Sequence, residues 1–434
     1  MKFYSTNNPE KKVDFATAVI SGIADDGGLY MPERIPKLPR AFIDNLQGMT
    51  LPEMSYAVAN YALMGSNISA QEMHDIVFQT LNFPIPLTYI DGDRYVLELF
   101  HGPTMGFKDV GARFMARMIE KYTSEHHHEA NVLIATSGNA GGAVAQGFSG
   151  IEGTHVWVLY PQDGLTRLQE AQFATLGGNV TALKVNGTLQ DCRDMVTEAF
   201  ADRELCQRMH LTSAKTINVA RLLPQMFYYF WAYAQLAQRE ENLDDVVFAV
   251  PCGNLGNLTA GIMARIMGLP VKRFVAANNR NNPFVRYLDN GDFTPLPVEP
   301  SLAPAMDIAV PRNFKRISAL LPSHIEVCEL VQGRTCTDAE IAYTIRRAWL
   351  DRGYLLDPHS ATAYLALADG LQPGEVGVSL ATAHPAKYRE VVEQAIGEPI
   401  EVPQQLVRHL SSPLHINHIG NGYNSLRQFL DTHQ

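Results

Sequence analysis

The feature that most constrains the fold is a repeated alternation of strand-like and helix-like segments, which begins near residue 91. Short apolar runs predict buried strands, and longer runs with apolar residues three and four positions apart predict helices. The predicted strands are 94–100, 131–135, 154–160, 180–185, 246–250, 271–276 and 376–380. The predicted helices are 109–122, 166–176, 189–208, 226–239, 258–267, 337–352, 359–371 and 387–396. This alternation is typical of an α/β fold with mostly parallel sheets, in which ligands bind beyond the carboxyl ends of the strands.

The first part of the chain lacks this alternation. Residues 1–90 begin with a helix-like run, 15–23, continue with further helical patterns, and end near the proline-containing sequence 83–86. We therefore expect a separate, mainly helical N-terminal domain. Residues 278–311 are rich in Asn, Pro, Gly and Asp, and they predict a long loop region.

Composition excludes several classes of function. The formal net charge is −10 and no basic patch carries interleaved aromatic residues, so we expect no nucleic-acid partner. No apolar run reaches the roughly 20 residues of a membrane span, and the N-terminus has no apolar signal core, so we expect a cytoplasmic protein without a membrane partner. The five cysteines form no CxxC pair, which indicates reduced thiols. Adjacent histidines at 126–128 do not share a helix face, and we predict no metal site.

One lysine lies where a predicted strand gives way to a predicted helix. The sequence from Glu98 to Asp109, ELFHGPTMGFKD, leaves the strand through a turn rich in Gly and Pro and places Lys108 at the start of the helix. A lysine there is either an ordinary surface cation or a Schiff-base lysine, because a helix N-terminus disfavours the protonated amine. This stretch alone does not decide between the two.

Two other predicted strand ends are rich in glycine. The sequence 136–142, TSGNAGG, places Asn139 at the start of a helix, and 251–257, PCGNLGN, has the composition of an anion cup made from backbone N–H groups. Each sequence also has a purely structural interpretation, as a tightly packed helix start or as a plain turn. For Asn139, a helix cap and a contact to a phenolic oxygen are both open.

Two further segments offer polar groups. The sequence 380–387, LATAHPAK, provides the hydroxyl of Thr382 and the imidazole of His384, either of which is also explained by hydrogen bonds within its own loop. The sequence 215–221, KTINVAR, combines two cations, a hydroxyl and an amide. It suits a phosphate or a carboxylate, since arginine offers a bidentate fork, and it equally suits a solvated helix start.

As a set, these motifs resemble the threonine synthases, pyridoxal-phosphate (PLP) enzymes of the tryptophan-synthase-β fold type. The resemblance covers nearly the whole chain. It rests on the sequences DGGLYMP (26–32), LFHGPTMGFKD (99–109), ATSG (135–138), LGGN (176–179), GNLGN (253–257), AMD (305–307), DPH (357–359) and TAHPAK (382–387). The lysine motif, GNLGN and TAHPAK in this order are highly specific as a set.

The resemblance implies a fold-type-II architecture of two open sheets with an N-terminal helical extension. It implies an N-terminal domain over 1–90, a large PLP-binding domain over 91–104 and 214–434, and a smaller inserted α/β domain over 105–213. It further implies conversion of O-phosphohomoserine and water into threonine and phosphate, by a monomer or small homo-oligomer. The only other partner implied is the small phosphorylated amino acid itself.

The resemblance also implies roles for individual residues. Lys108 would hold PLP as a Schiff base and move protons between substrate carbons, which requires a lowered pKa of its amine. Thr382 would bond the pyridine nitrogen and Asn139 the ring hydroxyl oxygen. The cofactor phosphate would lie in the cup formed by Gly253, Asn254, Leu255, Gly256 and Asn257. The substrate would contact Thr104, Ser137, Lys215, Thr216, Asn218 and Arg221.

Two positions depart from the family pattern. Ala140 stands where the family has a hydroxyl residue, and Lys215 stands where the family has asparagine. Both changes fall on the substrate side, so an alternative is a related phospho-lyase acting on O-phosphothreonine or a similar amino acid. A third interpretation, a catalytically silent member of this fold, is disfavoured by the presence of Lys108.

Overall fold

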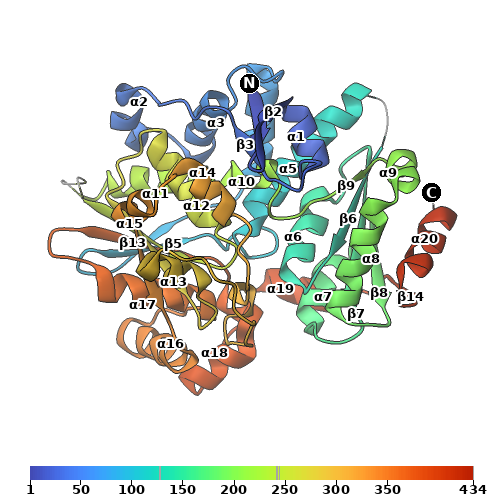
Figure 1. The fold of residues 1–434 in the computed structure, drawn as a ribbon. Coiled ribbons are helices and arrows are strands. Elements are labelled where there is room, and N and C mark those ends of the chain that lie inside the picture. Colours follow the sequence, from blue (N-terminus) through green and yellow to red (C-terminus); the bar gives the residue numbers. More distant parts are fainter. Residues whose placement is uncertain (127–128, 241–242, 244, 434) are drawn as a thin grey trace.

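Two open sheets flanked by helices form the body of the molecule (Figure 1), as the alternation predicts. The computed structural model describes residues 1–126, 129–240, 243 and 245–433. Within these ranges, the strands form sheets of three, six and five strands. His127 and His128 of the histidine triplet lie outside the described residues. None of the helices in the described ranges combines the length and apolarity needed to cross a bilayer.

The six-stranded sheet has the order β12-β11-β10-β13-β5-β4, and all neighbours run parallel except β4, which is antiparallel to β5. Its strands are β4 (Leu87–Asp91), β5 (Arg94–Glu98), β10 (Val246–Pro251), β11 (Arg273–Asn278), β12 (Val331–Thr335) and β13 (Val376–Ala381). The central strands β10, β11 and β13 are mainly apolar and almost entirely buried, because helices cover both faces of the sheet.

The five helices predicted for this domain are present with adjusted ends, and several short helices that were not predicted accompany them. Together they are α10 (Val219–Leu222), α11 (Gln225–Leu236), α12 (Gly256–Ile266), α13 (Pro283–Asn290), η2 (Pro304–Met306), α14 (Phe314–Leu320), α15 (His324–Leu330), α16 (Asp338–Arg352), α17 (Pro358–Gly370), η3 (Pro385–Tyr388) and α18 (Arg389–Ile396). Thr337 caps α16 as its sequence predicts. The region 278–311, expected as a loop, contains α13 and η2.

The five-stranded sheet has the order β14-β8-β7-β6-β9 and is parallel throughout. Its strands are β6 (Ala130–Ala135), β7 (Thr154–Pro161), β8 (Val180–Val185), β9 (Leu211–Thr212) and β14 (Ile416–Ile419). The helices around it are α5 (Lys108–His126), α6 (Asn139–Phe148), α7 (Arg167–Ala174), α8 (Leu189–Ala201), α9 (Arg203–Met209), α19 (Gln404–Ser411) and α20 (Tyr423–Thr432).

The C-terminal segment, which contains β14 and α20, packs on the smaller sheet and not in the large domain, where it was predicted. Strand β14 pairs with β8 of the smaller sheet, and α20 lies beside α8 (Figure 1). Leu426 and Leu430 of α20 are fully buried in the apolar cluster of that sheet, which explains why the segment leaves the large domain. The chain therefore crosses back to the smaller sheet after α18.

One predicted helix is two helices. The run 189–208 breaks at Asp202, whose ψ of 99° leaves the helical region. The Asp202 carboxylate accepts a hydrogen bond from the N–H of Leu205 and caps α9. Aspartate is favoured at a helix N-cap and disfavoured inside a helix, which explains the break.

The N-terminal part contains an antiparallel sheet that the helical prediction omitted. Strands β1 (Lys2–Ser5), β2 (Asn8–Asp14) and β3 (Tyr30–Pro32) are followed by α2 (Arg40–Asp44), η1 (Leu46–Gly48), α3 (Leu51–Ala62) and α4 (Ala70–Thr80), with α1 (Phe15–Ser21) between β2 and β3. Strand β2, NPEKKVD, is an exposed edge strand without an apolar face, so the sequence carried no alternating signal for it.

Candidate active site

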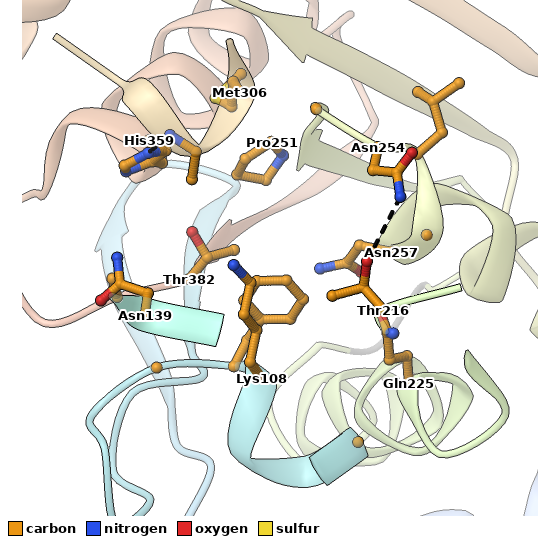
Figure 2. A pocket seen from close by; sticks show the side chains of 18 of the residues that line it. Lys108, Asn139, Thr216, Gln225, Pro251, Asn254, Asn257, Met306, His359 and Thr382 are labelled. Carbon is orange, nitrogen blue, oxygen red and sulfur yellow. Dashed lines mark hydrogen bonds between the residues drawn. The ribbon is translucent and has the colours of Figure 1, made fainter. Parts of the chain in front are cut away.

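A cavity of about 220 Å³ opens where the carboxyl ends of β5, β10 and β13 face the start of α6 (Figure 2). Most of the predicted site residues line it, although they come from distant parts of the chain. They are Thr104, Lys108, Asn139, Thr216, Arg221, Gly253, Asn254, Leu255, Gly256, Asn257 and Thr382.

The turn before Lys108 is fixed to the end of β13. The N–H of Phe107 donates to the carbonyl of Thr382 over 2.9 Å, and the N–H of His384 donates to the carbonyl of Met105 over 3.1 Å. Met105 adopts a left-handed conformation, with φ of 53°, which a non-glycine residue adopts only where its surroundings hold it. The lysine is thus held at a defined distance from the Thr382 loop.

The amine of Lys108 is poised as a nucleophile. Lys108 is the first residue of α5, and in the described residues its Nζ has no hydrogen-bond or ion-pair partner. Burial among protein atoms, with the nearby charges of Arg221 and Lys387, lowers its pKa to about 8. A substantial neutral fraction is therefore present near neutral pH, as the Schiff-base interpretation requires.

The turn 253–257 forms a cup at the start of α12. Leu255 is left-handed, with φ of 60°, and the residues of the helix start, whose N–H groups have no acceptor within the helix, line the cavity. Asn254 anchors the turn: its Oδ1 accepts from the N–H of Arg312, and its carbonyl accepts from Nδ2 of Asn313. A Cβ at Gly253 would meet the carbonyl of Ala305 at 2.9 Å, so only glycine fits there.

Asn257 presents an unused donor. Its Oδ1 accepts a hydrogen bond from the hydroxyl of Tyr229 over 2.7 Å, while its buried Nδ2 has no partner in the described residues. Figure 2 shows this nitrogen on the Lys108 side of the residue. A buried amide N–H without an acceptor indicates a missing ligand oxygen.

Asn139 lies on the other side of Lys108 from the cup (Figure 2). Its Nδ2 donates to the hydroxyl of Tyr388 over 2.7 Å. The glycines that follow have a packing role as well, since a Cβ at Gly141 would lie 2.4 Å from the side chain of Thr136. The structural interpretation of this sequence therefore applies, and the contact of Asn139 with a ligand stays a prediction.

Thr382 directly follows β13 and lines the cavity. Its N–H donates to the hydroxyl of Ser360, and its own hydroxyl has no partner in the described residues. His384, two residues later, accepts the N–H of Ala386 at Nδ1, and burial lowers its pKa to about 4. This neutral imidazole caps η3. The finding agrees with the interpretation of His384 as a residue bonded within its own loop, rather than as a catalytic base.

Three predicted substrate residues do not line the cavity. Both ends of the Asn218 amide are occupied: Oδ1 accepts from the N–H of Ala220, and Nδ2 donates to the carbonyl of Val19. Ser137 is exposed outside the cavity wall, and the Lys215 ammonium lies over the ring of Phe200.

Five polar residues of the cavity wall were not among the predicted site residues: Gln225, Asn313, His359, Lys387 and Tyr388. Lys387 and Tyr388 follow Thr382 at the same strand end, and this position is the signal that could have identified them. Gln225 and His359 lie at the starts of helices. His359 belongs to the sequence DPH, to which the resemblance assigned no role, and Gln225 has no motif of its own. The cavity-lining residues include the cations Lys108, Arg221 and Lys387 and, in the described part of the chain, no carboxylate.

The residues present fit PLP. The cup offers backbone N–H groups and the free Asn257 amide for a phosphate, Thr382 offers a neutral hydroxyl, and Lys108 lies between them with an unpaired amine (Figure 2). No metal is needed for this arrangement. Within the described ranges, no group of three or more His, Cys, Asp or Glu residues is placed to hold one.

Comparisons with known proteins agree with this arrangement. Residues 88–382 match the family model described as pyridoxal-phosphate dependent enzyme, 2–81 match the threonine synthase N terminus, and 360–430 match the threonine synthase C-terminal model. The chain is 40% identical to a threonine synthase of Haemophilus influenzae over 99% of both chains, and 38% identical to that of Escherichia coli over the whole of both.

Solved structures give the same result. The Escherichia coli threonine synthase superposes with a TM-score of 0.91 over 100% of both chains. The PLP-bound threonine synthase of Brucella melitensis superposes with a TM-score of 0.94 at 31% identity, over 100% of this chain and 99% of that one. The chain belongs to the threonine synthase family of PLP-dependent enzymes.

Proposed function

We propose that this enzyme converts O-phosphohomoserine and water into L-threonine and phosphate with PLP as cofactor. The observation that supports this most strongly is one cavity that joins Lys108 to the cup 253–257 and to Thr382, in a chain similar to threonine synthases over its full length. Neither Ala140 nor Lys215, the two departures from the family pattern, lines the cavity around Lys108.

Individual residues take the following roles. Asn257 and the backbone N–H groups of the cup would hold the cofactor phosphate, Thr382 would bond the pyridine nitrogen, and Asn139 would bond the ring hydroxyl oxygen. PLP, when bound, supplies an electron sink that acidifies the protons at Cα and Cβ of the substrate. Lys108 holds the cofactor and then carries protons at its Nζ, for which its pKa of about 8 is suited.

The charge of the cavity suits a substrate with a carboxylate and a phosphate. The net charge of −10 repels such a substrate at long range, and the cavity compensates with cations and no carboxylate among its described lining residues. Arg221 is buried and remains a cation, since burial lowers its pKa only to about 10. We propose that it and Thr216 contact the substrate near the cup.

We also propose that the enzyme works in the cytoplasm as a monomer or small homo-oligomer. The five cysteines are free thiols in the structure, which is in keeping with a reducing compartment.

The reaction is tested with purified enzyme loaded with PLP. We expect threonine and phosphate to appear in equal amounts from O-phosphohomoserine, and Lys108→Ala to form neither. Formation of 2-oxobutanoate from O-phosphothreonine, with no threonine from O-phosphohomoserine, would refute the proposed reaction in favour of a phospho-lyase.

A further inference from the structure

Lys387 is a buried cation that the roles above leave unused. It lies in η3, directly after the Thr382 strand end, and its side chain is only 6% exposed while lining the same cavity as Lys108. Its Nζ donates to the carbonyl of Thr104 over 2.7 Å. A buried ammonium is costly unless it is paired, so its presence at a cavity requires an explanation.

No carboxylate in the described residues forms an ion pair with Lys387 within 4.0 Å. Two buried acids, Asp109 and Asp357, act on Lys387 through their charge. Asp109 is engaged with Thr104: one oxygen accepts the Thr104 N–H and the other accepts its hydroxyl. Asp357 accepts the N–H groups of His359 and Ser360. The charge of Asp109 acts on Lys387 only at longer range. Lys387 is therefore not one half of a structural ion pair.

The contact with Thr104 does not explain Lys387 either. The same carbonyl also accepts a hydrogen bond from Nε2 of Gln172 over 3.1 Å. A neutral donor thus already satisfies this carbonyl, and the turn is held further by Gln405, which donates to the carbonyls of Gly102 and Pro103. An ammonium has three donors, and a single protein acceptor leaves the others for a ligand.

The position of Lys387 separates it from the cup. The next residue, Tyr388, bonds to Asn139, and Figure 2 shows Asn139 on the opposite side of Lys108 from Asn254. Tyr388 accepts the Asn139 N–H, so its own proton is available to donate, and burial raises its pKa so that the hydroxyl stays protonated. This end of the cavity presents a cation and a neutral donor.

We propose that Lys387, with Tyr388 beside it, binds an anionic oxygen of the substrate at the Asn139 end of the cavity. The oxygen belongs either to the phosphate or to the carboxylate of the amino acid, which share the chemistry that an ammonium recognises. This inference rests on the proposed function and adds a specificity-determining residue to it.

The test compares Lys387→Met and Lys387→Gln with the matched control Gln172→Leu, which removes the other donor to the Thr104 carbonyl and no charge. We expect both Lys387 variants to keep the cofactor absorbance and to raise the KM for O-phosphohomoserine at least about tenfold, the size of a lost charge-assisted hydrogen bond. Lys387→Arg should recover part of this loss. Gln172→Leu should leave the KM near its original value.

Two competitive inhibitors distinguish the source of the oxygen. Weaker inhibition of Lys387→Met by inorganic phosphate assigns Lys387 to the substrate phosphate, and weaker inhibition by L-threonine assigns it to the carboxylate. Either result supports the inference. An unchanged inhibition constant for both compounds overturns it, even if the KM has risen.

Other outcomes also overturn the inference. An unchanged KM does so, as does loss of bound cofactor or of folding in both Lys387→Met and Lys387→Gln, and so does an equal rise of KM in Gln172→Leu. These results concern Lys387 alone, provided that the unaltered enzyme makes threonine. An unaltered enzyme that makes none refutes the proposed function instead.

Discussion

The hydroxyl of Tyr229 donates a 2.7 Å hydrogen bond to Oδ1 of Asn257 and so sets the direction of the Asn257 amide. Without this bond, the two ends of the amide are free to exchange places. Because the bond occupies the oxygen, the Nδ2 donor is left for a ligand in the cavity. A buried tyrosine in α11 thereby determines which end of the Asn257 amide, in the cup at the start of α12, is available to a ligand.

Tyr229→Phe should weaken PLP binding. Loss of the hydroxyl removes about 1 kcal/mol of orienting hydrogen bond, so we expect the dissociation constant of PLP to rise roughly fivefold. The control is Tyr160→Phe, which removes another buried hydroxyl, bonded to Glu170 over 3.0 Å in the smaller domain. Fluorescence titration of the apoprotein measures both. Equal PLP affinity in the two variants would contradict the orienting role.

Gly253→Ala should damage the cup. A Cβ at this position meets backbone atoms of Ala305 and Met306 at 2.9 and 3.0 Å, which have no side-chain freedom to move aside. We expect the free energy of unfolding to fall by roughly 1–3 kcal/mol and the dissociation constant of PLP to rise. Gly48→Ala is the control, since its Cβ meets no atom within 4 Å. Chemical denaturation that finds both variants as stable as the unaltered enzyme would contradict the steric account.

Much of this arrangement was predictable from sequence, and its limits have physical causes. The alternating pattern identified the two large sheets because buried parallel strands are mainly apolar. The glycines of 253–257 correctly indicated a turn, and the structure gives the reason at Gly253, where a side chain has no room. The pattern missed β2, which is exposed except for the half-buried Val13, and β14, whose pairing with β8 depends on contacts far apart in sequence. Lys387 was overlooked because burial of a lysine is a tertiary property.

The attachment of PLP to the apoprotein should depend on pH in a specific way. The neutral amine of Lys108 reacts, and its pKa of about 8 means that the neutral fraction rises as pH increases through that value. We expect the attachment rate to rise to a plateau with a midpoint near pH 8. A midpoint near pH 10, typical of an exposed lysine, would contradict the burial of this amine.

The same measurement on Lys387→Met provides a check on the electrostatics. The charge of Lys387 contributes to the lowered pKa of Lys108, so its removal should move the midpoint to higher pH. A midpoint that stays in place or falls would show that burial and Arg221 alone determine the pKa of Lys108. The absorbance change on mixing apoprotein with PLP gives both midpoints.

The most direct test of the whole account asks which lysine holds the cofactor. Lys108 and Lys387 share one cavity and both have a pKa lowered to about 8, so basicity does not choose between them. Position does, because Lys387 is bonded to the Thr104 carbonyl whereas Lys108 lies unpaired between the cup and Thr382. Borohydride reduction of the PLP-loaded enzyme, followed by peptide mass analysis, should find the pyridoxyl group on Lys108. A pyridoxyl group on Lys387 or on Lys215, with Lys108 unmodified, would contradict the account.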